Sequence, residues 1–382
     1  MNLLNLARYC LLLGLGSMTA HSLFAQSSDW ETRIQDVFAP FDRSDHPGFA
    51  VGIMKDTSVI FQGGFGTANL EYQIPITPQT AFDLASVSKR FTAAGIALLM
   101  VEGRISLDSY VGAYFPDLGH FRDTLRLKHL IYNTSGIPEY WNLSHQDSMP
   151  WFDMYHFDYW DAWQAIIDMD QLEFRPGMKW AYRNSNYILL ADVIQQESDQ
   201  SFPAFMRQRI FLPLGMNHSL INADVTEIIP NRATPYMART PERISDFQEV
   251  GMTLDTVGAW IQMHRTSSHF GGSGMYSTVE DLMKWCRNFA EPAWGGAAWV
   301  EWMHHTESFP HGRNNQAFGL YWGEFARRKY VAWDGGTYGV STEMIRFPEQ
   351  QVAIVVLSNW GEGRAHDKAM EIAQILIDAG IL

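Results

Sequence analysis

Apolar runs with the spacing of β-strands lie near both ends of this chain. Near the N-terminus, residues 49–54 and 58–62 are two such runs, separated by a polar turn. Four more lie near the C-terminus, at residues 320–325, 329–333, 341–347 and 352–357. Short runs rich in β-branched and aromatic residues, bounded by Gly and polar residues, predict strands. Amphipathic helices are predicted before them at about 30–41 and after them at about 365–377.

Between these ends, from about residue 90 to 305, helical segments alternate with loops. Strands at both ends with helices between them predict one antiparallel sheet made from the two termini, with a mainly helical lobe inserted. This is an α/β fold of the α+β type. We expect one domain over residues 26–382, with a sheet lobe at about 26–85 and 306–382 and a helical lobe at about 86–305. Side chains from both lobes would meet at the seam, where pockets commonly form.

The first 25 residues have the pattern of a cleavable secretory signal. Arg8 supplies the positive start, residues 11–15 the apolar centre, and residues 23–25 a cleavage site before Gln26. The apolar run is too short to span a bilayer, so we expect a secreted or periplasmic protein without stable membrane insertion. Loss of the leader leaves Cys286 as the remaining cysteine, which rules out an internal disulfide and predicts a fold held by its core.

The formal net charge of the chain is −14. Nucleic acids and anionic membranes attract clusters of Lys and Arg, so this acidity argues against both as partners. The thirteen histidines form no H-E-x-x-H motif and no tight His/Asp cluster, so we expect no metal and no other cofactor. A small molecule is the expected partner, and the sequence leaves the oligomeric state open.

Ser86 and Lys89 form the one S-x-x-K pattern of the chain, at the head of an apolar run that Gly103 ends. If Ser86 opens a helix, positions i and i+3 share a face, and the hydroxyl and amine can touch. A serine needs such a neighbouring base to act as a nucleophile at neutral pH. Because the run is apolar on all sides, the helix should be buried and the pair should lie at a cleft floor. A solvated helix start is the alternative.

A second constellation is Tyr182-Arg183-Asn184, which follows a Pro-Gly turn and precedes an amphipathic helix. A tyrosine at such a junction can point into a cleft and, beside Lys89, exist as a phenolate or relay a proton. Tyr-x-Asn also occurs at residues 140–142, so only the flanking pattern favours Tyr182.

A third constellation, Trp333-Asp334-Gly335-Gly336, stands at the end of a predicted strand. Gly335 and Gly336 would let a substrate carbonyl approach the backbone closely. A backbone N–H aimed at the carbonyl oxygen is half of an oxyanion hole, often the largest contribution to acyl-transfer catalysis. An ordinary Gly-rich hairpin turn is the alternative.

Taken in chain order, these motifs resemble the serine β-lactamase and penicillin-binding-protein superfamily, in particular its class C-like branch. That branch includes class C β-lactamases, D-Ala-D-Ala carboxypeptidases, D-aminopeptidases and family VIII carboxylesterases. The likeness covers nearly all of the mature chain, and the remaining blocks that carry it are residues 82–89, 129–138, 174–190, 213–216 and 271–278. Because so many blocks agree in the same order, a chance resemblance is untenable.

The resemblance implies a role for each site residue. Ser86 would attack a carbonyl and become acylated, while Lys89 and Tyr182 would share the general base and acid work. Asn184 would orient Lys89 and the acyl side of the substrate. The N–H groups of Ser86 and Gly336 would form the oxyanion hole, and water would release the acyl group.

One position departs from the family pattern. Family members usually carry Lys or His where this chain has Trp333, and that cation holds a substrate carboxylate. An indole has one N–H donor and no charge, so a charge-assisted bond of about 1.5–3 kcal/mol is lost. A loss of this size weakens recognition of a penicillin-type carboxylate by roughly one to two orders of magnitude. The neighbouring Asp334 would further repel an anion.

We therefore expect a serine hydrolase that acts through an acyl-enzyme on ester or amide bonds, and we favour a carboxylesterase for uncharged acyl esters. A D-amino-acid peptidase or amidase, with Asp334 holding a substrate ammonium, is the first alternative, and a class C-type β-lactamase is another. A catalytically silent binding protein on the same fold is the alternative of another class.

Aromatic residues crowd residues 151–163. They predict either an acyl or alcohol pocket, with Trp160 and Trp163 setting the chain length of the substrate, or helical core packing. Core packing is favoured, because aromatic residues at this density mostly bury apolar area.

Overall fold

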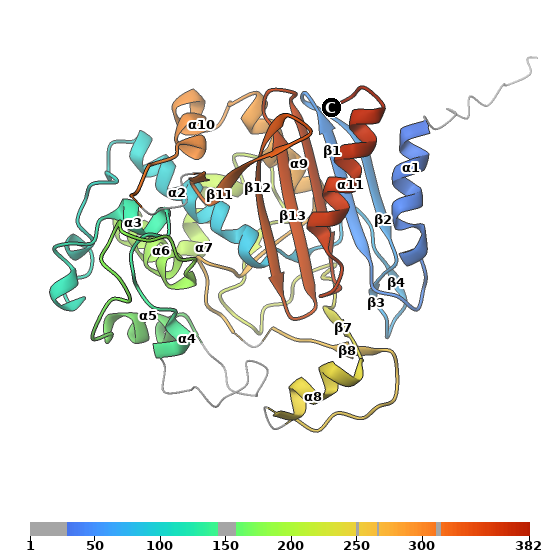
Figure 1. Cartoon of the computed structure of the whole chain (residues 1–382), viewed down its shortest axis with the longest axis horizontal. Helices are drawn as coiled ribbons and strands as arrows, with labels where there is room; N and C mark the ends of the chain where they lie inside the picture. The colour runs from blue at the N-terminus through green and yellow to red at the C-terminus, as the bar shows by residue number, and fades with distance from the viewer. Residues whose placement is uncertain (1–28, 144–157, 250–251, 266, 311–314) are drawn as a thin grey trace, which may run out of the picture.

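The computed structural model describes residues 29–143, 158–249, 252–265, 267–310 and 315–382 (Figure 1). The predicted leader, residues 1–25, and much of the aromatic segment lie outside these ranges. Within them, a seven-stranded antiparallel sheet has the order β10-β11-β12-β13-β14-β1-β2. Its strands are β1 (Phe49–Lys55), β2 (Ser58–Phe65), β10 (Gln316–Ala317), β11 (Leu320–Phe325), β12 (Arg328–Thr337), β13 (Val340–Phe347) and β14 (Val352–Ser358).

The two ends of the chain meet inside this sheet, as the sequence predicted. β1 pairs with β14 along its whole length, from Phe49 opposite Ser358 to Lys55 opposite Val352. β14 is buried at every position because both faces of the sheet are covered. Helices α1 (Asp29–Phe38) and α11 (Ala365–Asp378) cover one face (Figure 1), and α9 (Val279–Ala290) packs on the other, against β1 and β14.

The segments between the two halves of the sheet are mainly helical. They include α2 (Ser88–Val101), α3 (Leu127–Ile131), α4 (Tyr140–Leu143), α5 (Tyr159–Ile167), α6 (Asn184–Ser198), α7 (Phe202–Phe205), a π-helical turn (Met206–Phe211), α8 (Pro241–Glu249) and α10 (Gly296–His304). The predicted α+β class is therefore confirmed. The boundaries drawn between the lobes near residues 85 and 305 remain predictions.

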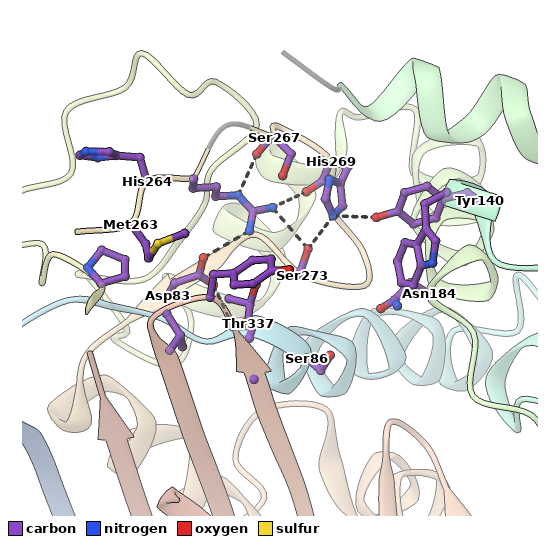
Figure 2. Close-up of a pocket in the computed structure, with 17 residues that line it drawn as sticks. Asp83, Ser86, Tyr140, Asn184, Met263, His264, Ser267, His269, Ser273 and Thr337 are labelled. Carbon is purple, nitrogen blue, oxygen red and sulfur yellow. Dashed lines mark hydrogen bonds and ion pairs between the residues drawn. The ribbon is translucent and has the colours of Figure 1, made fainter. Parts of the chain in front are cut away.

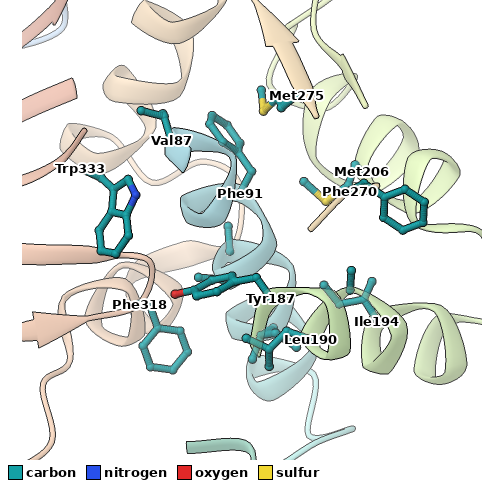
Figure 3. Packing of buried hydrophobic residues seen from close by; sticks show 14 of the residues in the cluster. Val87, Phe91, Tyr187, Leu190, Ile194, Met206, Phe270, Met275, Phe318 and Trp333 are labelled. Atoms are coloured by element: carbon teal, nitrogen blue, oxygen red, sulfur yellow. The ribbon is translucent and has the colours of Figure 1, made fainter. Parts of the chain in front are cut away.

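Helix α2 is the central element of this region and is buried almost all round. It packs against α6 and α10 (Figure 3). Gly95 permits the close approach to α6, because a Cβ there would lie 2.8 Å from Ile194 Cδ1. The helix ends at Val101, and Gly103 with φ +71° follows as the predicted stop.

Three small sheets were not predicted. They are β3–β4, β5–β9–β6 and β7–β8, built from β3 (Thr67–Asn69), β4 (Ile74–Pro75), β5 (Phe82–Asp83), β6 (Leu220–Ile221), β7 (Tyr236–Ala238), β8 (Trp260–Gln262) and β9 (Met275–Ser277). Strands of two or three residues are too short to show a period of two in the sequence. The β5–β9–β6 sheet matters for the site, because β5 leads directly into Ser86 and β9 follows the loop behind Lys89.

The described part of the aromatic segment favours core packing. Tyr159 is buried and its ring stacks on Phe270, with centroids 4.2 Å apart. The Trp163 indole donates to Asp192 of α6 at 3.2 Å. Trp160 is 60 % exposed.

Candidate active site

The predicted nucleophile lies at a strained bend between β5 and α2. Ser86 occupies a single 3₁₀ turn, Ala85–Val87, and not the first turn of the α-helix itself. Ala85 has φ +46°, a left-handed conformation that costs an L-residue of this kind roughly 1–2 kcal/mol. The Asp83 carboxylate accepts the Ala85 N–H at 2.8 Å and so holds the bend. Ser86 is thereby presented at the surface of a cavity.

The structure brings Ser86, Lys89 and Tyr182 together. Ser86 Oγ lies 3.1 Å from Lys89 Nζ and 2.6 Å from Tyr182 Oη. Lys89 Nζ is also 4.8 Å from the centre of the Tyr182 ring. The hydrogen-bond distances allow Ser86 to exchange a proton directly with either Lys89 or Tyr182, and they distinguish Tyr182 from Tyr140, whose hydroxyl instead contacts His269 at 3.0 Å.

Lys89 is completely buried and has two further partners. Its Nζ donates to Asn184 Oδ1 at 2.5 Å and to the Gly272 carbonyl at 2.7 Å. Burial lowers the pKa of Lys89 to about 7, although the negative charges of Glu139 and Asp334 act in the opposite direction. A lysine with this pKa is neutral in a large fraction of molecules at neutral pH, as a general base must be.

Burial has the opposite effect on the phenol. It raises the pKa of Tyr182 well above its usual value, and the nearby charge of Glu139 adds to the rise. The environment therefore favours the protonated phenol over the phenolate that the sequence left open. Tyr182 is suited to donate a proton.

Asn184 is positioned by a carboxylate that the sequence analysis missed. Glu139 accepts both the Asn184 backbone N–H, at 2.8 and 3.0 Å from its two oxygens, and the Asn184 side-chain amide. These bonds fix the amide so that its oxygen points at Lys89. Glu139 directly follows one of the family-like blocks, but nothing in its spacing marks it as a partner of a residue 45 positions away.

The third motif continues strand β12 beyond its predicted end. Gly335 pairs with Thr342 and Gly336 with Ser341, so the glycines belong to the ladder and not to a hairpin turn. A Cβ on Gly335 would lie 2.4 Å from the Leu84 carbonyl and 3.1 Å from the Ser86 nitrogen, so only glycine fits there. This contact sets the backbone of β12 beside the backbone of Ser86, the arrangement that the expected oxyanion hole requires.

Trp333 lies at the same site. It is 5 % exposed, and its ring centre is 6.1 Å from that of Tyr182. A cavity beside it is bordered by the following residues: Ser86, Trp180, Tyr182, Gln316, Tyr321, Trp333, Asp334 and Gly336. Strand alternation places Asp334 on the face of its pairing partner Glu343, which contacts His366 of α11, and opposite the face of Gly335.

A second cavity opens on the other side of Ser86 (Figure 2), where Asn184, Tyr140 and Thr337 border it. A buried ion pair joins Arg265 to Asp83, with Nη1 3.2 Å from Oδ2. Arg265 Nη2 donates to the His269 carbonyl at 2.8 Å and to Ser273 Oγ at 3.3 Å. The arginine therefore links the bend before Ser86 to the loop that supplies the Gly272 carbonyl.

Asp83, Gly272 and Arg265 were missed as functional residues. The first two fall inside family-like blocks, so the sequence marked their segments without revealing their contacts. Arg265 stands in no recognised motif, and only the fold brings it to Asp83, 182 positions away.

The described residues lack two features that would indicate a metal site or a membrane span. They contain no group of three or more His, Cys, Asp or Glu side chains placed to hold a metal ion. No helix among them has the length and apolar character needed to cross a membrane.

Comparisons with known proteins agree with the geometry. A "D-aminopeptidase" of Gluconobacter oxydans is 26 % identical over 337 residues, which are 88 % of this chain and 59 % of that protein. "Penicillin-binding protein 4*" of Bacillus subtilis is 26 % identical over 82 % of this chain and 68 % of its own length. The chain thus spans less than two thirds of the D-aminopeptidase.

Solved structures share the fold. A penicillin-binding protein homologue of Pyrococcus abyssi, described as octameric, has a TM-score of 0.74 and 25 % identity, over 92 % of this chain and 77 % of its own. D-amino acid amidase of Ochrobactrum anthropi has a TM-score of 0.73 at 21 % identity, over 92 % of this chain and 100 % of its own. The hydrolase EstCE1 has a TM-score of 0.70 at 19 % identity, over 91 % of this chain and 98 % of its own. At the lower identities the likeness concerns the fold alone.

The model of the family described as "Beta-lactamase" matches residues 34–377, which is most of the chain. Together with the relatives, this match confirms the resemblance that the motifs indicated. The chain belongs to the beta-lactamase family.

Proposed function

We propose that this protein is an acyl-enzyme carboxylesterase for uncharged acyl esters, with Ser86 as its nucleophile. One observation carries the proposal: Ser86 Oγ is within hydrogen-bond distance of both a buried lysine amine and a buried phenol. The lysine amine can accept the proton of Ser86, and the phenol can donate a proton. The catalytic roles of Lys89 and Tyr182 are part of this proposal.

The hydrogen bonds around Lys89 favour it as the base. A neutral amine has two N–H donors and one lone pair. The Asn184 oxygen and the Gly272 carbonyl can only accept, so they take both N–H groups, and the lone pair remains for the Ser86 hydroxyl. Ser86 then attacks the ester carbonyl as its proton passes to Lys89.

Tyr182 acts next, as the acid. It donates to Ser86 Oγ in the resting enzyme and can deliver its proton to the leaving alkoxide, recovering one from Lys89. The N–H groups of Ser86 and Gly336 bind the oxyanion. Water repeats the sequence in the second half-reaction and releases the acid.

The preference for esters rests on the cavity next to Tyr182. A proton donor to the leaving group lies on the leaving-group side, so the cavity bordered by Tyr182, Trp180 and Trp333 would take the alcohol. Its aromatic lining supplies apolar surface, and the described residues that border it include no cation for a carboxylate. This supports an uncharged alcohol over a penicillin-type or D-Ala-D-Ala leaving group.

Hydrolysis of D-amino-acid amides is the second candidate. The names of the relatives favour it, because two of the proteins above are a D-aminopeptidase and a D-amino acid amidase. Asp334 borders the same cavity, although strand alternation places its side chain on the face opposite Gly335.

A fluorophosphonate probe tests whether Ser86 is a nucleophile at all. We expect labelling of the wild type and none of Ser86→Ala, while an equally folded Ser88→Ala should still label. Absence of labelling in the wild type would indicate a binding protein on this fold.

Parallel assays on p-nitrophenyl esters, D-alanyl amides and nitrocefin then test the substrate class. We expect ester turnover to dominate, and Trp333→Lys to raise nitrocefin turnover by roughly ten- to a hundredfold, the value of one charge-assisted bond. Brisk nitrocefin or amide hydrolysis by the wild type would overturn the ester assignment.

We also propose that the chain is exported and loses its first 25 residues. N-terminal sequencing of the protein recovered from the periplasm or medium should begin at Gln26. Recovery of the intact N-terminus in the cell pellet would contradict export.

A further inference from the structure

Two arginine side chains are buried in one part of the core, away from Ser86. Arg90 on α2 has no exposed surface and Arg346 on β13 is 5 % exposed. Among the described residues, neither has a carboxylate oxygen within the 4.0 Å of an ion pair. Buried guanidinium groups normally have an acidic partner, because an isolated charge in the interior costs several kcal/mol.

The partners that these arginines do have are neutral. Arg90 Nη2 donates to the Met344 carbonyl at a long 3.4 Å, and its Nε and Nη1 have no hydrogen-bond partner. Arg346 Nη2 donates to His304 Nε2 at 2.8 Å, its Cζ lies 3.5 Å from the centre of the Phe289 ring, and its Nε has no partner. Three buried guanidinium nitrogens, which carry four N–H groups, are therefore unused.

The titratable groups nearby do not supply the missing negative charge. Burial lowers the pKa of His304 to about 3, so its imidazole is neutral, and raises the pKa of Cys286 to about 11, so it is a thiol. Glu343, the closest buried carboxylate on β13, faces α11 and bonds to His366 at 2.8 Å. Burial, and then repulsion by Arg90, lower the pKa of Arg346 to about 9, while burial lowers the pKa of Arg90 against a smaller opposing effect of Glu343.

A cavity of about 110 Å³ opens onto Arg346. Its wall is formed by α9, the end of α10 and the turn between β13 and β14, and includes Cys286, Phe289 and His304. The one acid at its border is Asp56, whose side chain is 61 % exposed and lies 3.9 Å from Lys55 Nζ. The space is large enough for a monatomic ion with a water molecule.

We propose that this cavity binds a small monovalent anion of the chloride type, which the guanidinium of Arg346 contacts where it borders the cavity and which compensates the charge of Arg90. The site is independent of the proposed esterase activity. Its ligand class follows from two buried positive charges without an acidic partner and from the small volume of the cavity. The anion would stabilise the packing of β13 against α2, α9 and α10.

The first test compares thermal unfolding of the mature protein in sodium chloride and in sodium gluconate at equal ionic strength. Gluconate is a bulkier anion of the same charge, so it controls for general salt effects. We expect chloride to raise the unfolding midpoint by about 2–4 °C with a saturable dependence, as ligand linkage requires. Equal midpoints in the two salts at every concentration would overturn the proposal.

The second test removes the charge that faces the cavity. Arg346→Met keeps most of the side-chain volume and should abolish the chloride-specific shift, while Arg287→Met removes an exposed arginine of α9 and should retain it. A chloride shift that survives in Arg346→Met places the effect elsewhere and contradicts the proposal.

A third measurement covers the case in which Arg346→Met does not fold. Anomalous scattering from wild-type crystals grown in bromide should show a peak within hydrogen-bond distance of the Arg346 guanidinium. A cavity that contains only water in those crystals overturns the proposal, whatever the variant does.

Discussion

At the scale of single residues, the site depends on groups that burial has moved away from their ordinary protonation state. Lys89 is enclosed by α2, α6 and the Gly272 loop, and its amine loses the solvation that normally keeps it charged. Glu139 partly offsets this loss with its negative charge. The balance between the two sets the pH at which Ser86 can be activated.

The pH profile of hydrolysis should report this balance. Because the proposed base is the neutral amine of Lys89, kcat/KM should rise about tenfold per pH unit below pH 7 and level off above it. Glu139→Gln removes a charge that raises the pKa of Lys89, so the inflection should move to lower pH. Lys89→Arg should abolish turnover at all pH values, since guanidinium keeps its proton. A flat profile from pH 5 to 8 would exclude Lys89 as the base.

The bend before Ser86 gives a second prediction. In Asp83→Asn, the carboxylate that accepts the Ala85 N–H and pairs with Arg265 is replaced by a neutral amide. Leaving Arg265 buried without its partner should cost on the order of 3 kcal/mol of folding free energy. The nucleophile should also lose its position, so kcat should fall more than KM rises. Urea denaturation and steady-state kinetics measure the two effects, and a stable variant with unchanged kcat would contradict them.

At the scale of elements, the sequence predicted well what depends on long apolar patterns. The strands at both ends, α2 and its stop at Gly103 stand where their periodicity placed them. Strand β12 runs on to Thr337 because Gly335 and Gly336 still pair with β13, although glycine weakens the sequence signal for a strand. The contacts of Glu139 and Arg265 were not predictable, because residues far apart in the chain make them and no local pattern records them.

The packing of α2 on α6 yields a prediction of its own. Gly95→Ala should change stability little, because the gain in helix propensity of about 1 kcal/mol offsets a tight contact with Ile194. Gly95→Val should overpack the contact and cost about 1–3 kcal/mol. Because Lys89 and Asn184 stand at the starts of these two helices, the valine variant should also lose activity. Thermal unfolding and ester assays on both variants test this. Equal unfolding midpoints and equal activities of the alanine and valine variants would contradict a tight contact between α2 and α6 at Gly95.

At the scale of the whole molecule, the last helix is attached to the sheet by a titrating pair. His366 of α11 lies 2.8 Å from Glu343 of β13, and this bond is the main cause that raises the pKa of His366. Burial is the main cause that raises the pKa of Glu343. Both groups therefore bind protons more tightly in the folded state than in the unfolded chain.

The sign of the resulting pH dependence follows directly. A raised histidine pKa stabilises the fold fully below about pH 6.5, and the contribution is lost as the pH rises through the folded-state pKa. The unfolding midpoint of the wild type should therefore fall relative to that of His366→Gln between pH 6 and 8. Parallel curves for the two proteins over this range would show that the pair does not contribute. Because His366 is 42 % exposed, the effect should be small.

The adjacency of β1 and β14 has a consequence for biogenesis. Strand β1 obtains one of its two neighbours, β14, only after the residues between Lys55 and Val352 have been synthesised. Until then its edge is open to foreign strands, and closure requires contacts of high sequence separation, which form slowly. Chains cut short before β14 should consequently aggregate instead of accumulating as partly active fragments.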